Sequence, residues 1–200
     1  MKEKQLYESN FYRYYTEKAG LTEAEFEQLL PYFEFKELKH NQLLLRTGEV
    51  CKHVFFVEQG LLQSFSIDEK GGEHILQFAP ENWLVADRAS QYFNEPSDYY
   101  IKAIEPSIVV FLAIPFFENA SNLSRSFSCF NENSLQRSIY FMQRRINSLL
   151  GMTAKERYLE FLKLYPNLLL RVPQWMIASY LGVTPESLSR VRREIAKDSF

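Results

Sequence analysis

The sequence predicts an α+β fold in three parts: an antiparallel β domain preceded by helices, a long amphipathic helix, and a C-terminal helix-turn-helix. Short β-rich runs separated by glycine and proline turns fill the stretch from Phe35 to Pro115. Apolar residues then recur at the spacing of a helix seam, and two short helical patterns flank Gly182. A chain of 200 residues that is 46% hydrophobic has enough apolar side chains for a buried core.

The N-terminal part begins with helical spacing over residues 5–32, where Thr22 is a suitable N-cap for the segment "EAEFEQLL". The β-rich runs that follow are "QLLLRT", "HVFFVEQG", "LLQSFSID", "HILQFA", "YYIKAI" and "SIVVFLAI". The segment "IDEKGGEHIL" predicts a hairpin in which Gly71 and Gly72 supply positive φ. Strands of this length and spacing predict a sandwich, a roll or a barrel.

A helical seam runs through the middle of the chain. Its apolar residues are spaced by 4, 3, 4 and 3 positions and are Leu135, Ile139, Met142, Ile146 and Leu149. One interpretation is an amphipathic helix packed on its own domain, and the other is a coiled coil between two copies of the chain. Two heptads leave both interpretations open, and the five residues are the candidate dimer interface.

The end of this helix is marked by Gly151, because the capping-box sequence from Thr153 to Glu156 starts a new helix directly afterwards. We therefore expect an N-terminal domain with its helices over residues 1–118, a dimerisation helix over residues 119–150, and a terminal helix-turn-helix domain over residues 151–200.

Charge is distributed unevenly along the chain. Residues 1–133 carry 12 lysines and arginines against 20 aspartates and glutamates, whereas residues 134–200 carry 11 against 5. The C-terminal part is therefore a basic module within a chain whose net charge is only −2. Such an asymmetry favours a polyanionic partner for that part.

Two short helices form the core of this basic module. Residues from Gln174 to Tyr180 predict the first helix, and Gly182 is suited to a left-handed turn. Thr184 is a suitable N-cap for the second helix, and Pro185 fits its first position.

The second helix has two distinct faces. Its apolar stripe is Leu188, Val191 and Ile195, and the facing side of the first helix offers Ile177, Ala178 and Leu181. The outward face carries Glu186, Ser189, Arg190 and Arg193. Such a helix fits a DNA major groove about 12 Å wide, where arginine bonds guanine and glutamate accepts from cytosine. The alternative is a helical hairpin whose arginine-rich face is simply solvated.

Residues for catalysis or metal binding do not form a recognisable motif. His74 has no second histidine close in sequence, and motifs of serine hydrolases, zinc proteases and phosphate-binding loops do not occur. Cys51 and Cys129 are too few for an iron–sulfur cluster. We predict a non-enzyme with no catalytic residue, no metal and no cofactor; redox switching by the cysteines and haem binding through His40, His53 or His74 stay open.

The sequence also predicts where the protein resides. The segment "MKEKQLYESNFYRYY" has no apolar core of a signal peptide, and no apolar run reaches the length of a membrane span. Two widely separated thiols fit a reducing compartment. We therefore expect a cytoplasmic protein with no membrane contact.

Two segments carry a resemblance to a known family. "LLLRTGEVCKHVFFVEQGLLQSFSID", with Gly48-Glu49 and Gly60 at its turns, resembles the opening of a β-roll, and "PESLSR" resembles a recognition helix. Over residues 20–200 the chain resembles the cyclic-AMP receptor protein (Crp/Fnr) family of bacterial transcription regulators. The resemblance implies an antiparallel β-roll of cyclic-nucleotide-binding type, a long homodimer helix through the seam, and a C-terminal winged helix-turn-helix. Because the chain stops soon after Ile195, a wing would be short or absent.

The resemblance also implies roles for residues of the terminal module. Glu186 and Arg190, which keep the family's spacing of four, would read bases, whereas Gln174, Thr184 and Ser187 would hold phosphates. Pro185 stands where the family has its first arginine, so one base contact would be missing.

The roll departs from the family's nucleotide site. Val85-Ala86 stands in place of the family's Gly-Glu pair, and Ser97 in place of its arginine, so we do not expect cyclic AMP to bind. Asp87 is a candidate cap for the short helix that follows. A pocket for another ligand would use Trp83, Arg88, Tyr99 and Lys102, although core aromatics and surface cations are the favoured explanation of these residues.

Together these observations predict a homodimeric, sequence-specific regulator of transcription that binds an inverted repeat in double-stranded DNA. RNA polymerase is a further expected partner, and the effector is not identified. The alternative is a sensor of a small ligand that acts through protein partners without binding DNA.

Overall fold

The computed structural model describes residues 6–198 and divides them into two compact units. The first unit takes the residues up to Ser66 together with Gln77–Gln136. The second takes Ile67–Leu76 together with the residues from Arg137 onward. Among residues 6–198, no helix combines the length and the apolar character that crossing a bilayer requires.

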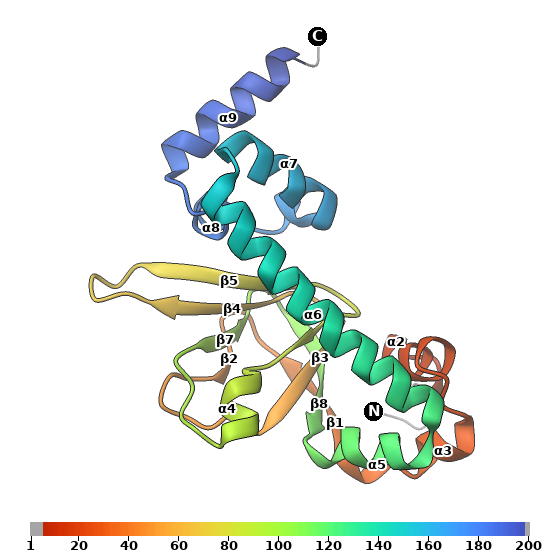
Figure 1. Cartoon of the computed structure of the whole chain (residues 1–200). Helices are drawn as coiled ribbons and strands as arrows, with labels where there is room; N and C mark the ends of the chain where they lie inside the picture. The colour runs from red at the N-terminus through yellow and green to blue at the C-terminus, as the bar shows by residue number, and fades with distance from the viewer. Residues whose placement is uncertain (1–5, 199–200) are drawn as a thin grey trace. The chain divides into compact units, whose positions relative to one another are not determined.

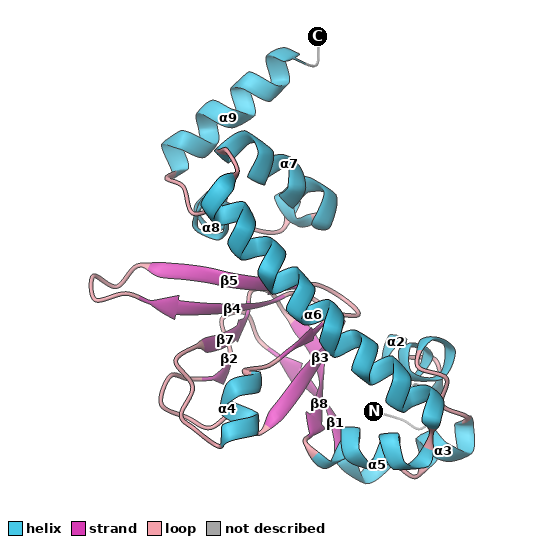
Figure 2. Cartoon of the chain, viewed as in Figure 1, coloured by secondary structure: helices cyan, strands magenta, loops and turns pink. Residues whose placement is uncertain are grey.

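Within residues 6–198, antiparallel strands form two four-stranded sheets, drawn in magenta in Figure 2. One sheet has the order β1-β8-β3-β6 and the other β2-β7-β4-β5. The strands are β1 Phe33–Leu38, β2 Leu43–Leu45, β3 His53–Gln59, β4 Leu62–Ile67, β5 Glu73–Ala79, β6 Leu84–Val85, β7 Tyr100–Ala103 and β8 Ser107–Ala113. Each of the six predicted β runs overlaps a strand of the structure.

The strand β1 was not predicted, and neither was the two-residue strand β6. The sequence of β1, "FEFKEL", comes directly after Pro31-Tyr32. It forms a strand because it pairs with β8, where Phe33 lies opposite Leu112 and Leu38 lies opposite Ser107. The predicted hairpin joins β4 and β5, as Figure 1 shows. Only Gly71 of its glycine pair has a positive φ, of +83°.

The two faces of the first sheet pack against different layers, because side chains alternate along a strand. Phe55, Val57 and Val109 belong to a core that also contains residues of the second sheet, such as Ile101. Phe56 and its neighbours on the opposite face belong to a second core, built largely of aromatic side chains from the helices.

These helices are α2 Asn10–Arg13, a π-helical segment Tyr14–Lys18, α3 Glu23–Glu27 and α5 Pro115–Leu123. The predicted single helical stretch over residues 5–32 is therefore interrupted, and residue 5 lies outside the described residues. Gly20, with φ of +77°, separates the π-helical segment from α3. Thr22 caps α3 as predicted and forms a capping box with Glu25.

The second unit is helical apart from its hairpin. The helices are α6 Arg125–Gly151, which begins in the first unit, α7 Ala154–Leu164, a 3₁₀ turn Leu168–Leu170, α8 Gln174–Leu181 and α9 Pro185–Asp198. Gly151 ends α6, and the predicted Thr153–Glu156 capping box starts α7. Between residues 137 and 198 no strand is present, so this described part contains no wing. The proposed dimerisation segment 119–150 covers the end of α5 and most of α6.

Candidate nucleic-acid interface

The helix α9 packs on α8 through its aliphatic stripe. Leu188 is only 1% exposed, Val191 is buried, and Ile195 is half-buried. Ile177, Ala178 and Leu181 of α8 are buried, as the sequence predicted for the facing side. With an apolar face fixed in this way, the polar face of α9 points to solvent.

A second layer of contacts supports the packing of these helices. The rings of Phe161 and Tyr165 from the α7 segment lie 5.5 and 5.7 Å from the ring of Tyr180 on α8. Lys155 on α7 forms an ion pair with Glu194 on α9 at 2.8 Å. The three helices thus form one packed group.

The turn between α8 and α9 has the conformation that the sequence predicted. Gly182 is left-handed, with φ of +65° and ψ of 38°, and its N–H donates to the carbonyls of Ala178 and Ser179. A Cβ atom at this position would lie 3.2 Å from Cδ2 of Leu149, so a side chain would meet both backbone strain and crowding.

The start of α9 is capped by Thr184, the residue that precedes the helix. The hydroxyl of Thr184 accepts the N–H of Ser187 at 3.2 Å, and Pro185 is the first helical residue. Both features were predicted. Ser187, a predicted phosphate contact, also accepts a hydrogen bond from the Arg190 guanidinium at 3.1 Å.

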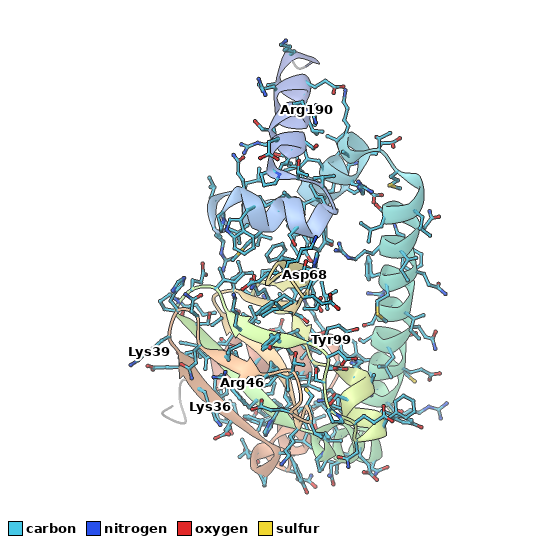
Figure 3. All side chains as sticks on the ribbon, turned by 90° about the vertical axis from the view of Figure 1, so that its left-hand side faces the viewer. Lys36, Lys39, Arg46, Asp68, Tyr99 and Arg190 are labelled. Carbon is cyan, nitrogen blue, oxygen red and sulfur yellow. The ribbon has the colours of Figure 1, made fainter. Side chains whose placement is uncertain are left out.

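The outward face of α9 forms a shallow, open depression. Figure 3 labels Arg190, which lies on this helix. The residues that line the depression are Pro185, Glu186, Ser189, Arg190 and Arg193. Four of the seven predicted DNA-binding residues are thus brought together there. Gln174 is exposed at the first position of α8 and does not line this depression.

The surroundings of Glu186 on this face favour its ionised carboxylate. The pKa of Glu186 lies below its ordinary value because its own backbone N–H and the Thr184 hydroxyl bond the carboxylate, and because Arg190 is close. The face therefore presents an anionic acceptor and cationic donors side by side. Such a pair matches the donor of a cytosine and the acceptors of a guanine in a major groove.

The predicted dimer seam lies in solvent in the single chain. Ile139, Met142, Ile146 and Leu149 of α6 are between 41% and 58% exposed, whereas Leu135 is half-buried. An apolar face of this kind marks an interaction site more often than an ordinary surface does.

The four candidate ligand residues of the roll are not gathered on one side of a sheet. Trp83 packs on the core that contains Ile101 and Ala103. Lys102 lies between these two residues on β7 and has its ammonium group 4.4 Å from the ring centroid of Phe65. Because side chains alternate along β7, Lys102 is on the opposite side of the sheet from the core that Trp83 contacts.

A buried polar contact occupies the region where the family resemblance placed a nucleotide site. Asp87 caps α4, Arg88–Phe93, by accepting the N–H of Ser90. Its other carboxylate oxygen accepts the hydroxyl of Ser97 at 2.7 Å, and both residues are less than 9% exposed. The cap was predicted, but the bond to Ser97 was missed because it joins residues ten positions apart. Tyr99, 37% exposed, donates its N–H to the Ser97 hydroxyl.

The described residues contain no cluster of candidate metal ligands. Within residues 6–198, no three histidine, cysteine, aspartate or glutamate side chains lie close enough together to hold an ion. The thiol of Cys51 is buried, and burial raises its pKa above the ordinary value.

Comparison with known proteins agrees with these features. The cyclic nucleotide-binding domain model matches residues 35–122. The chain is 25% identical over 189 residues to the anaerobic regulatory protein of Pasteurella multocida, covering 88% of this chain and 68% of that protein. It is 26% identical over 186 residues to the fumarate and nitrate reduction regulatory protein of Vibrio cholerae, covering 86% and 72%.

A solved structure shows the same fold. FixK2 from Bradyrhizobium japonicum superposes with a TM-score of 0.65 at 19% identity, over 84% of this chain and 86% of that one. The order of a β-roll, a long helix and a terminal helix-turn-helix is the one that the family resemblance implied. Over most of its length, the chain is similar to transcription regulators of the Crp/Fnr family.

Proposed function

We propose that the protein is a cytoplasmic, homodimeric regulator that recognises an inverted repeat in double-stranded DNA and has no enzymatic activity. In such a dimer, two α9 helices about 34 Å apart would enter successive major grooves on one side of the duplex. Glu186 and Arg190 would contact base edges, and Gln174, Thr184 and Ser187 would contact phosphates.

The observation that carries this proposal is the pair of faces on α9. Leu188 and Val191 are buried, while Glu186 and Arg190 are exposed at the N-terminal half of the helix. Ser189 and Arg193 extend the same polar face. A solvated structural helix does not require an exposed acidic residue among the arginines, whereas base reading uses both charges.

The exposed seam of α6 supports the homodimer. The chain leaves Ile139, Met142 and Ile146 about half exposed, and burying such surface stabilises an assembly by about 25 cal/mol per Å². Their spacing matches the a and d positions of a coiled coil, so a second copy of the same helix is the complementary partner.

We further propose that the roll does not hold cyclic AMP. Asp87 and Ser97 bond each other where the family's phosphate-binding groups would stand, and a buried carboxylate repels a phosphate. Any effector of the roll would therefore be of another kind. RNA polymerase is proposed as the partner through which bound protein acts on transcription.

Selection of duplexes from a random-sequence pool tests the proposal. Wild-type protein should recover inverted repeats, and its affinity for them should fall steeply with added salt. Glu186→Gln with Arg190→Ala should lose the sequence preference, while the matched surface variant Arg137→Ala should keep it. Equal recovery of all sequences would overturn specific recognition, and no recovery would favour a sensor that acts through protein partners. Repeating the selection with cell metabolites tests for an effector.

A further inference from the structure

The hairpin tip Ile67–Leu76 belongs to the same compact unit as the helix-turn-helix, although it lies far from it in sequence. The contact is made by Ser179 on α8. Its hydroxyl donates to the carbonyl of Glu73 at 2.7 Å and accepts the N–H of Ile75 at 3.0 Å. The Glu73 carbonyl and the Ile75 N–H lie on either side of His74 in β5. This strand is at the edge of its sheet. The serine thus bonds the groups that a neighbouring strand would otherwise use.

Arg145 on α6 also bonds the hairpin, at Ile75. The guanidinium of Arg145 donates to the carbonyl of Ile75 at 3.2 Å and to the carbonyl of Tyr180 at 2.8 Å. The guanidinium carbon Cζ of Arg145 lies 3.7 Å from the centroid of the Tyr180 ring, which is a cation–π contact. The Tyr180 carbonyl is in the last turn of α8, where carbonyls lack a helical partner. One arginine therefore joins α6, β5 and α8.

The hydrogen bonds of this contact are partly shielded from water, which increases their strength. Ile75 is only 2% exposed, and Ser179 and Arg145 are both half-buried. Tyr180 also packs on the rings of Phe161 and Tyr165. A displacement of the hairpin would therefore disturb α8 and, through the adjacent turn at Gly182, the position of α9.

We propose that Ser179 and Arg145 are positioning residues that fix the hairpin Ile67–Leu76 against α8, so that the hairpin forms part of the DNA-binding unit. The proposal rests on the proposed function for its effect on DNA affinity. The outward face of α9 is exposed while the hairpin is bound, so the contact orders the reading helix and does not cover it.

The test compares Ser179→Thr with Ser179→Val in the full chain. The two side chains have nearly the same shape, and only threonine keeps the hydroxyl. Hydrogen exchange of residues 67–79 reports the contact directly, because the Ile75 N–H is one of its donors. We expect Ser179→Thr to match the wild type within about twofold, and Ser179→Val to exchange about tenfold faster, the effect of losing a part-buried hydrogen bond.

The same pair is then titrated with a duplex recovered by the wild type. We expect Ser179→Val to bind about three- to tenfold more weakly than Ser179→Thr. Arg145→Met gives a second test that keeps the apolar stem, and Arg137→Met is its control because it removes the same charge from an exposed position of α6. We expect faster hairpin exchange and weaker binding in Arg145→Met than in Arg137→Met.

Equal exchange in Ser179→Thr and Ser179→Val, with Arg145→Met equal to Arg137→Met, would overturn the hairpin contact. Altered exchange with unchanged DNA affinity would overturn the positioning role. If the wild type recovers no duplex, the proposed function fails, and the exchange comparison still decides whether the hairpin is held.

Discussion

Replacing Arg190 with alanine removes a single exposed guanidinium from the outward face of α9. In the free protein this group bonds the Ser187 hydroxyl at 3.1 Å. An exposed contact of this kind contributes little to folding, so the free energy of unfolding should change by less than about 0.5 kcal/mol. The expected effect of the substitution is therefore on DNA recognition.

The size of that effect follows from the contact that is lost. A bidentate bond from arginine to guanine contributes about 1–3 kcal/mol of discrimination. On one half-site this is about a 5- to 140-fold loss of affinity. A symmetric dimer loses the contact twice, so the loss on a complete inverted repeat is about 2–6 kcal/mol.

Fluorescence anisotropy measures this loss on the selected operator and on duplexes in which each base pair of the half-site is changed in turn. Arg190→Ala should bind the selected operator weakly and become indifferent to one base pair, while Arg137→Ala, also exposed, retains the full preference. If Arg190→Ala weakens binding equally on every duplex and lowers the salt slope by about 2, which is about 1 for each subunit, the residue contacts phosphate and the assignment is wrong.

Three further predictions concern assembly, stability and pH. Ile139→Asp with Ile146→Asp places charges in the seam of α6 and should give single chains by sedimentation; persistent dimers would show that the interface lies elsewhere. Leu188→Ala, at a side chain 1% exposed, should lower the free energy of unfolding by about 2–5 kcal/mol in urea, and a loss below about 1 kcal/mol would contradict its core position. The pKa of His53 lies below its ordinary 6.5 because of burial and then the charge of Lys36, so the unfolded chain binds its proton first. Stability should therefore fall as pH drops through 6.5, and His53→Gln should lose part of that slope in urea titrations between pH 7.5 and 5; an unchanged slope would refute this origin.

Local chemistry allowed much of the C-terminal unit to be predicted. The left-handed Gly182, the Thr184 cap and the Thr153–Glu156 capping box depend on residues within four positions of one another. The stripe of Leu188 and Val191 follows from helical periodicity alone. These features are decided by short-range sterics and hydrogen bonds, so the sequence of a short segment is enough to specify them.

Long-range pairing decided the rest. The segment Phe33–Leu38 becomes a strand because it lies against β8, and a lysine of β7 is kept from the inter-sheet core by the register of its neighbours. The bond between Asp87 and Ser97, and that between Ser179 and the hairpin, join residues that no motif connects. By itself, the sequence determined where the helices α7, α8 and α9 start and turn, and which face of α9 presents charge. Only the tertiary structure decided which polar groups meet across the chain, because the chain connectivity between distant residues fixes neither their separation nor their direction.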